Sequence, residues 1–231
     1  MCARITYRLN QSLQEMAELM LGDDGPDGWL PTPGYNICPT QMVAAVRVTA
    51  DAGRRELVPL KWGLIPSWSK DPKIASSCIN ARAETVATKP AFRSAFKRRR
   101  CLLLADGYYE WTGKPGKKQP WHFRFPDDRV FAFAGLWECW NPPEREAVET
   151  CTIVTTAANE LAATYHDRMP VILDPGDYAR WLDPAAPTDR LLPLLESRPV
   201  DGLLVAAANP LVNNPRNQGP ELLVPPSAEV P

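Results

Sequence analysis

The stretch CLLLADGYYEW, residues 101–111, decides the fold. Its apolar run is too short for a comfortable helix and is interrupted by Gly107, so we predict a buried strand that leads into a turn. Upstream of it, residues 42–49 and 55–65 have the composition of two strands around a turn at 51–53. The sequence therefore predicts a hairpin next to a buried strand.

Short helices are expected at several places around these strands. Residues 12–22 begin with Ser12 and carry Glu15 three positions later, which is a capping-box spacing, and Gly22 is a natural stop. Residues 90–100 place their apolar side chains on one helical face and end in basic residues. Further strands are predicted at 120–126, 130–137, 150–157, 169–173 and 203–208, and further short helices near 159–164, 175–182 and 188–196.

Strands outnumber helices in this prediction, and the two do not alternate regularly. This favours an α+β fold with a mostly antiparallel or mixed curved β-sheet, or a barrel-like core, and short peripheral helices. The chain has 231 residues and shows no internal repeat or break in composition, so we expect a single domain over residues 1–224. The Pro-rich tail, residues 225–231, is expected to be frayed.

Composition excludes several classes of protein. Hydrophobic residues make up 45% and charged residues 23%, which excludes a disordered, collagenous or coiled-coil chain. The net charge of −1 provides no global field for a polyanion, so any nucleic-acid site must be a local patch. There is no apolar run of membrane-spanning length and no signal-peptide pattern, so we expect a cytoplasmic protein that does not bind membranes.

The six cysteines are far apart and form no CxxC pair, which supports neither a zinc site nor a redox dithiol. We therefore expect no metal and no cofactor. Five of the cysteines lie beside apolar residues and are predicted to be buried free thiols: Cys38, Cys78, Cys101, Cys139 and Cys151.

Cys2 stands apart from the other five. Once Met1 is removed, the chain begins with a cysteine that has both a free α-amine and a thiol. Their reference pKa values of ~8 and ~8.5 predict that both are partly nucleophilic near neutral pH. An aldehyde can form a Schiff base with the amine, after which the thiol closes a thiazolidine ring. The alternative is that Cys2 is an incidental residue at the end of the chain.

Polar residues interrupt two otherwise apolar segments, the first around residues 80–84 and the second at Glu110. Asn80, Arg82 and Glu84 alternate, as one face of an extended segment would; this is a candidate site, or else a solvent-facing strand with an ion pair. Glu110 lies between aromatic residues, where its pKa can be raised so that it serves as general acid or base. The alternative for Glu110 is a glutamate at the rim of a turn.

His166 lies on a loop whose direction is fixed by Pro170, where catalytic residues are often found. A structural histidine is the alternative, and His122 is predicted to pack within a strand.

Trp62 and Trp68 are either stacking residues or core residues. Basic residues gather in two places along the chain. Lys97 to Arg100 form one basic run. The second group lies beside Tyr108, Tyr109 and Trp111, and cations interleaved with aromatic rings suit single-stranded nucleic acid. The alternative is a solvated helix end and a solvated turn. The second group comprises Lys114, Lys117 and Lys118.

Seven segments together, in this order, resemble the SOS-response-associated peptidase (SRAP) family, whose members shield abasic sites in single-stranded DNA. The resemblance spans nearly the whole chain. Its segments are MCAR at the start, YNICPTQ at 35–41, KWGLIPSW at 61–68, INARAET at 79–85, ADGYYEW at 105–111 with KKQP at 117–120, HDRMP at 166–170 and NQGPELL at 217–223.

The resemblance implies roles for the candidate residues. Cys2 would attack the ring-opened aldehyde of an abasic site and form a thiazolidine crosslink, with Glu110 as proton shuttle and His166 assisting ring opening and Schiff-base chemistry. Asn80 and Arg82 would hold the abasic nucleotide. The remaining positions expected along the DNA groove are Arg4, Trp68, Trp111, Thr155 and Arg168.

The chain departs from the family pattern at three positions. Ala3 replaces the usual glycine, and an alanine would be strained at a positive φ. Met169 stands where many members have a basic or polar residue, so one phosphate contact is expected to be missing. Cys38 replaces a small apolar residue and is a second thiol near the pocket.

Three functions remain open from the sequence. The first is a cofactor-free, monomeric protein that crosslinks to abasic sites in single-stranded DNA, with abasic-site lyase activity as a side reaction if the thiol closes the ring slowly. The second is an N-terminal-nucleophile cysteine peptidase, whose own α-amine is its base and whose substrate could be its own leader alone. The third is a catalytically silent binder of single-stranded DNA.

Overall fold

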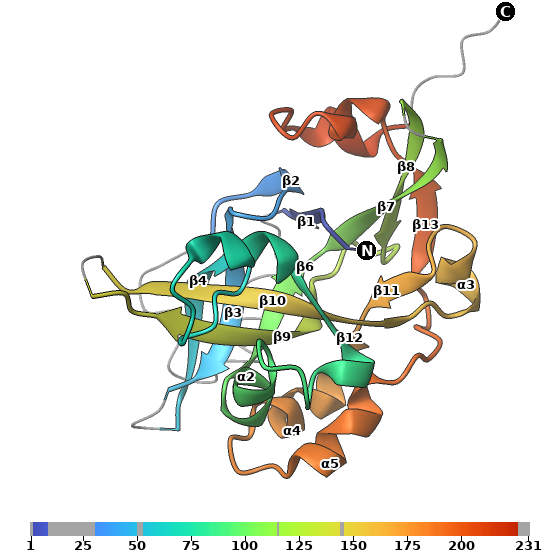
Figure 1. The fold of residues 1–231 in the computed structure, drawn as a ribbon. Helices are drawn as coiled ribbons and strands as arrows, with labels where there is room; N and C mark the ends of the chain where they lie inside the picture. Colours follow the sequence, from blue (N-terminus) through green and yellow to red (C-terminus); the bar gives the residue numbers. More distant parts are fainter. Residues whose placement is uncertain (1, 9–30, 50–52, 115, 144–145, 226–231) are drawn as a thin grey trace, which may run out of the picture.

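The structure is a computed structural model and describes residues 2–8, 31–49, 53–114, 116–143 and 146–225. Two β-sheets lie against each other, and short helices cover one end of the molecule (Figure 1). None of the helices in these ranges has the length and apolar character that a membrane span requires.

The smaller sheet has five strands in the order β13, β8, β7, β1, β2, and all its neighbours are antiparallel. It brings the start of the chain between two later segments, because β1 pairs with β7 on one side and with β2 on the other. Its strands are β1 (Ile5–Tyr7), β2 (Gly34–Ile37), β7 (Gly107–Lys114), β8 (Lys117–Arg124) and β13 (Leu204–Ala207).

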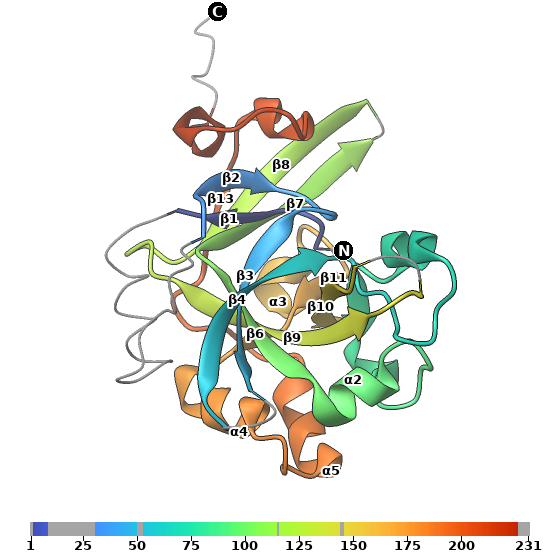
Figure 2. The ribbon, with the colours of Figure 1, turned by 90° about the vertical axis from the view of Figure 1, so that its left-hand side faces the viewer.

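The larger sheet has eight strands and closes into a barrel, because β10 pairs with both β4 and β9. The ring runs β10, β4, β3, β6, β9 and back to β10 (Figure 2). Only the pairings of β10 with β4 and with β5 are parallel among those described. The strands are β3 (Met42–Val48), β4 (Arg55–Trp62), β5 (Asn80–Arg82), β6 (Arg100–Ala105), β9 (Phe131–Trp140), β10 (Val148–Ala157), β11 (Arg168–Pro170) and β12 (Ile172–Leu173).

The predicted fold class is confirmed. The structure is a mixed α+β fold that is mostly strand, with a curved, mainly antiparallel sheet closed into a barrel. The hairpin predicted from 42–49 and 55–65 is present as β3 and β4, which pair in register from Met42 opposite Lys61 to Val48 opposite Arg55.

The stretch 101–111 contains the connection between the two sheets. β6 lies in the barrel between β3 and β9, and β7 lies in the smaller sheet. The expected turn after the buried strand is wrong: the chain bends at Asp106 and continues as a strand of the other sheet. Gly107 leaves the space that this crowded bend needs, since a Cβ there would lie 2.2 Å from His122 Nε2.

The helices are shorter than predicted. The segment 188–196 divides into an α-helix and a 3₁₀ turn at Pro193, which cannot donate a backbone hydrogen bond. The segment 169–173 likewise divides at Val171 into two strands. The predicted helix at 12–22 and the tail beyond 225 lie outside the described residues. The α-helices are α2 (Arg93–Arg98), α3 (Glu160–Ala163), α4 (Tyr178–Leu182) and α5 (Thr188–Leu191), and the 3₁₀ turns are Pro72–Ser77, Ala83–Thr85, Pro175–Asp177, Leu192–Leu195, Pro210–Asn213 and Pro220–Leu223.

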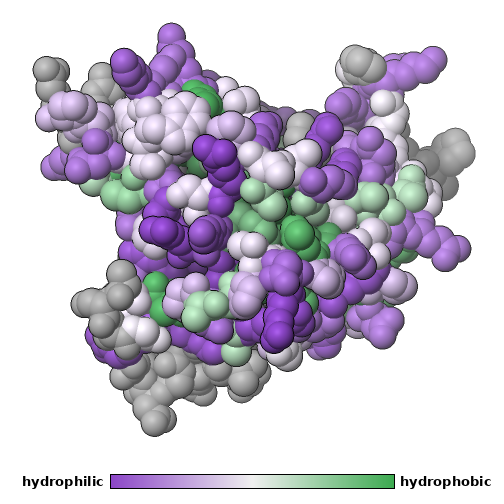
Figure 3. Space-filling model, turned by 60° about the horizontal axis from the view of Figure 1, so that its bottom comes forward, coloured by the Kyte–Doolittle hydropathy of each residue, from purple (hydrophilic) through white to green (hydrophobic). Residues whose placement is uncertain are grey.

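The hydrophobic core fills the barrel and the space between the sheets. Trp62, left open from the sequence, is a core residue, and His122 is buried in β8 as predicted. On the face turned forward in Figure 3, hydrophilic side chains surround a smaller group of hydrophobic ones. The cysteine prediction is partly wrong, because Cys38 and Cys139 are only half-buried; all six are free thiols.

The basic run at 97–100 ends in a buried arginine, which corrects the interpretation of a fully solvated helix end. Arg100 donates from Nη1 to the carbonyl oxygens of Phe96 (2.7 Å) and Lys97 (2.8 Å). Its Nε donates to the carbonyl oxygen of Trp181 at 2.7 Å, and its Nη2 donates to that of Asp183. One guanidinium thus joins the end of α2 to the end of α4 across β6.

We expect Arg100→Met to lower the free energy of unfolding by about 3 kcal/mol, because four carbonyl groups lose their donor in the protein interior. Chemical denaturation measures this change. Arg98→Met, at an exposed position of the same run, is the matched control and should change stability by less than about 0.5 kcal/mol. Equal stability of the two variants would contradict this role of Arg100.

Candidate functional site

Cys2 is fully buried at the junction of the two sheets, directly before β1. The side-chain amide of Asn80 in β5 donates to its carbonyl oxygen at 2.7 Å. β5 is itself held in place by β10, with Asn80 opposite Ile153. The barrel therefore fixes the backbone of Cys2 through a single buried amide.

The Cys2 thiol is not ionised near neutral pH, which corrects the expectation from the sequence. Burial raises the pKa of this thiol strongly, and the nearby negative charge of Glu110 raises it further. The backbone N–H of Arg4 has a smaller opposing effect on this pKa. A reaction of this sulfur therefore needs a group that accepts its proton.

Glu110 in β7 is such a group. It is only 3% exposed, and burial raises its pKa to about 7. This supports the predicted general acid or base and contradicts a glutamate at an exposed rim. A carboxyl group with this pKa both accepts and releases protons near neutral pH.

The loop that carries His166 packs on Trp121, the cross-strand neighbour of Glu110. Glu110 pairs across the sheet with Trp121, and Tyr165, the residue before His166, packs on the Trp121 ring with 4.9 Å between centroids. The charge of Asp167 also raises the pKa of Glu110, after the larger effect of burial. The structure thus brings three of the four predicted catalytic positions, Cys2, Asn80 and Glu110, to one place, with the His166 loop beside them.

Burial lowers the pKa of His166. The backbone N–H of Arg168 donates to its Nδ1 at 2.9 Å. The carboxylate of Asp167 is 2.8 Å from the same Nδ1 and can pair with the ring when it is protonated. The loop therefore fixes the direction of the ring.

The expected alternation of Asn80, Arg82 and Glu84 on one face is wrong. β5 ends at Arg82, and Glu84 lies in a 3₁₀ turn. The Glu84 carboxylate accepts from Arg168 at 2.5 and 3.0 Å rather than pairing with Arg82. Arg82 is exposed and pairs with no carboxylate in the described part of the chain, so its charge is available to a ligand.

Thr155 and Arg168, both expected along the DNA groove, are held mainly by the protein. Thr155 is buried in β10, opposite Arg82, and its hydroxyl donates to the carbonyl oxygen of Ala81 at 3.5 Å. Arg168 donates to the Thr155 carbonyl oxygen at 2.6 Å and also pairs with Glu84. These residues shape the wall of the site beside Arg82.

A cavity of about 420 Å³ lies next to Cys2 on the side of the smaller sheet. Arg4 stands over the ring of Trp111, with 5.6 Å between the guanidinium carbon and the ring centroid. All partners of Arg4 among the described residues are neutral, so its positive charge is not compensated. The cavity lining comprises Ala3, Arg4, Trp111, Gly116, Lys118 and Asn213.

Asn36 is a site residue that the sequence does not reveal. Its Oδ1 accepts from Arg4 Nη1 at 2.6 Å, and its Nδ2 donates to the carbonyl oxygens of Val212, Asn214 and Asn217 at 3.0–3.3 Å. This buried amide thus ties Arg4 to the last segment of the chain. The segment YNICPTQ carries part of the family resemblance, but nothing in it singles out the asparagine.

Two further residues of the site are not evident from the sequence. Asn213 accepts from the indole N–H of Trp111 at 2.6 Å and so orients the ring in the cavity. The hydroxyl of Tyr108 is buried and has no hydrogen-bond partner within the described ranges. Tyr108 is on the same face of β7 as Glu110, and alternation along the strand is the only signal that could have found it.

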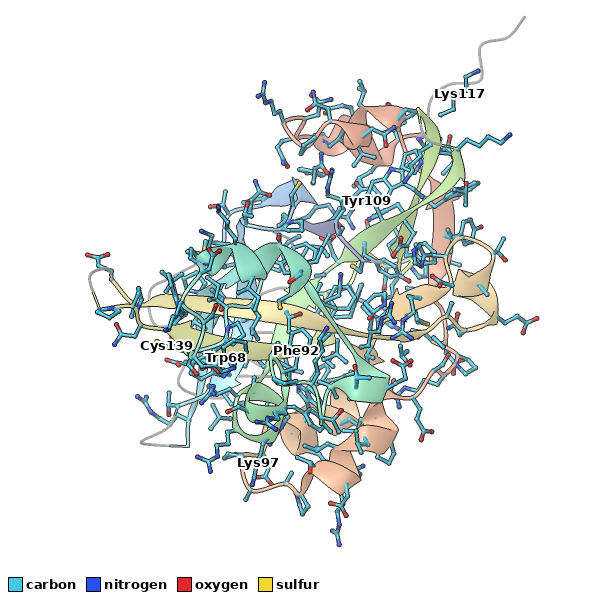
Figure 4. All side chains as sticks on the ribbon, viewed as in Figure 1. Trp68, Phe92, Lys97, Tyr109, Lys117 and Cys139 are labelled. Carbon is cyan, nitrogen blue, oxygen red and sulfur yellow. The ribbon has the colours of Figure 1, made fainter. Side chains whose placement is uncertain are left out.

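Trp68 lies apart from this site. It is 60% exposed on the loop after β4, and Figure 4 shows it well away from Tyr109, the neighbour of Glu110. The structure therefore does not bring Trp68 together with Trp111, although a DNA contact is predicted for both.

The three departures from the family pattern have structural outcomes. Ala3 is not among the residues with positive φ, so the expected strain is absent. Met169 is buried and its sulfur accepts from the backbone N–H of Asn159 at 3.3 Å, so position 169 faces the interior and not a phosphate. Cys38 is half-buried and donates to the carbonyl oxygen of Asn36 at 3.3 Å.

The family model described as SOS response associated peptidase (SRAP) matches residues 1–215. The chain belongs to this family. The barrel, the buried Cys2 and the cavity beside it are therefore features of an SRAP protein. In the described part of the chain, no group of three or more His, Cys, Asp and Glu side chains is arranged to hold a metal ion.

Relatives of this SRAP protein are found in bacteria and vertebrates. Abasic site processing protein YoqW of Bacillus subtilis (strain 168) is 43% identical over 193 residues, which covers 83% of this chain and 85% of that protein. Abasic site processing protein HMCES of Gallus gallus is 37% identical over 212 residues, covering 80% of this chain and 62% of that protein.

Solved structures share the fold. A crystal structure of a protein from Bordetella bronchiseptica has a TM-score of 0.72 and 29% identity, covering 90% of this chain and 100% of that one. A second, from Bacteroides thetaiotaomicron, has a TM-score of 0.73 at 24% identity, covering 94% of this chain and 91% of that one.

We expect Glu110→Gln to stabilise the protein more at pH 8 than at pH 4.5. The folded-state pKa of about 7 lies above the ordinary value of 4.5, because the buried carboxyl group favours its protonated form. Its contribution to the unfolding free energy is therefore fully present at low pH and is lost as the pH rises through 7. The stability difference between variant and wild type should grow by about 3 kcal/mol over this range. Chemical denaturation at several pH values measures this difference in unfolding free energy. Glu196→Gln, at an exposed position, is the control. A difference between Glu110→Gln and wild type that does not change with pH would contradict burial of the Glu110 charge.

Proposed function

We propose that this protein processes abasic sites in single-stranded DNA by forming a thiazolidine crosslink through Cys2. The observation that carries the proposal is the burial of Cys2 beside a carboxyl group whose pKa is about 7. The names of YoqW and HMCES support the class of substrate. The adjoining cavity, with Arg4 above Trp111, supports a nucleotide as ligand.

The reaction needs one proton carrier that works in both directions. After removal of Met1, the α-amine of Cys2 adds to the C1′ aldehyde of the ring-opened sugar. Protonated Glu110 gives its proton to the carbinolamine hydroxyl, which leaves as water and yields the Schiff base. The thiol then adds to the same carbon of the protonated Schiff base, and its proton passes to the Glu110 carboxylate, which is thereby protonated again. The net change is aminothiol plus aldehyde to thiazolidine plus water.

The other residues hold the reactants. Asn80 fixes the Cys2 backbone through its amide N–H, and its own Oδ1 is buried without a partner among the described residues, which leaves it to accept from the amine or a sugar hydroxyl. His166 assists ring opening by giving a proton to the sugar oxygen that is released. Arg82 contacts the phosphate of the abasic nucleotide.

Strand cleavage competes with ring closure. A Schiff base at C1′ makes the C2′ proton more acidic, so β-elimination can cut the strand whenever the thiol adds slowly. Lyase activity is therefore a side reaction that the thiol suppresses. The other candidate, an N-terminal-nucleophile peptidase, would use the same cysteine on a peptide bond.

We expect Cys2→Ala to form no stable crosslink with an abasic-site oligonucleotide while still binding it reversibly. Intact mass before and after incubation measures the adduct, with undamaged DNA as the substrate control. Cys38→Ala, which removes the half-buried thiol near the pocket, is the matched control and should crosslink normally. A full yield of adduct from Cys2→Ala would overturn the proposal. Cleavage of peptides with no adduct from wild type would favour the peptidase.

We expect Glu110→Gln to lower the single-turnover rate of crosslinking by roughly 10²-fold, because one positioned acid–base group typically contributes 10²–10⁴. The rate of wild type should change slope near pH 7, where Glu110 titrates, and this inflection should be missing in the variant. Rates measured over a pH range on both sides of this value check the prediction. An inflection retained in the variant would exclude Glu110 as its source.

A further inference from the structure

Three lysines lie together at the tip of the β7–β8 hairpin. Lys114 is directly opposite Lys117 in the register, and Lys118 follows opposite Gly113. All three are exposed, and no carboxylate in the described ranges pairs with them. Like charges directly opposite each other in a sheet are destabilising. The hairpin therefore keeps an arrangement that costs stability in the isolated protein and that an anion would relieve.

The hairpin places Lys114 and Lys117 at its outer end, while Lys118 lies nearer the cavity. β7 and β8 extend beyond the rest of their sheet, and Lys117 lies at the far end of the hairpin, opposite in the view to Lys97 on α2 (Figure 4). Gly113 has a φ of 97°, and a Cβ there would lie 2.6 Å from the carbonyl oxygen of Lys117. Only glycine tolerates this close turn, so the geometry of the tip is specified by the sequence.

The lysine tip is continuous with the cavity beside Cys2. Gly116 and Lys118 line that cavity together with Arg4 and Trp111. Burial raises the pKa of Glu110, and the positive charge of Lys118 opposes this rise, so the two side chains interact electrostatically. A row of uncompensated cations thus runs from Arg4 through Lys118 to Lys114 and Lys117.

We propose that the β7–β8 hairpin binds the phosphodiester backbone of single-stranded DNA on one side of the reacting nucleotide. The inference rests on the proposed function and adds a second contact region to it. Phosphates along a strand match a row of lysines that pair with no carboxylate in the part of the chain that the structure describes, and Trp111 supplies a ring on which a base can stack between them and Cys2. The hairpin thereby makes binding depend on the nucleotides on one flank of the lesion.

The test uses the double variant Lys114→Gln/Lys117→Gln and a matched control, Lys97→Gln/Arg98→Gln, which removes two exposed charges from α2. The ligand is a single strand with a tetrahydrofuran abasic analogue, which has no aldehyde and cannot crosslink. Binding is measured by fluorescence anisotropy at several salt concentrations. The analogue is placed either near the 5′ end or near the 3′ end, so that only one flank is long.

For the flank that reaches the hairpin, the plot of log affinity against log salt should become less steep by about 1.4, since each phosphate that a lysine no longer neutralises lowers the slope by about 0.7. The control should keep the wild-type slope. For the other flank, the hairpin variant should behave as wild type. Its melting temperature should stay equal or rise, because a like-charge pair is removed.

An unchanged slope with both flanks would overturn the hairpin contact, and so would an equal change of slope in the control variant. The proposed function is tested separately with aldehyde-bearing DNA at saturating concentration. There, the hairpin variant should crosslink at the wild-type rate. Absence of any crosslink from wild type would overturn the proposed function even if the salt slopes behave as expected.

Discussion

The buried carboxylate of Asp106 is the interaction on which the site depends. It lies where the chain leaves the barrel at β6 and enters the smaller sheet at β7, and it accepts from the Thr6 hydroxyl at 2.5 Å. The backbone N–H and the Nε of Arg8 also donate to it, at 2.6 and 3.0 Å. Thr6 lies in β1, so one carboxylate fixes the strand that follows Cys2 to the connection between the sheets.

Neutral His122 completes this network. Burial lowers its pKa to about 3, and its Nε2 lies 3.1 Å from the Thr6 hydroxyl. Because that hydroxyl donates to Asp106, the histidine is its donor. Gly107 leaves the space for this contact, since any larger residue would overlap the His122 ring. The start of the chain is thus held by packing and hydrogen bonds that leave little freedom for Cys2.

Burial is also the source of the site's chemistry. It keeps the Cys2 thiol protonated and raises the pKa of Glu110 into the physiological range, so the two effects are complementary. A neutral thiol close to a carboxyl group that titrates near pH 7 can react without a permanently exposed thiolate. Such a thiol is also protected from oxidation when no substrate is present.

The sequence by itself determined the fold class, most strands and the identity of the candidate nucleophile, because these depend on local patterns: alternation, short apolar runs and the position of Cys2. The tertiary structure decided the rest. Glu84 pairs with Arg168, 84 positions away, instead of with Arg82, and Arg4 bonds to the carbonyl oxygen of Val212, 208 positions away. Of the predicted site, Cys2, Asn80 and Glu110 converge with the His166 loop beside them, whereas Trp68 lies elsewhere. Single-residue chemistry follows from composition and spacing, but pKa values and partners follow from burial, which only the packed chain creates.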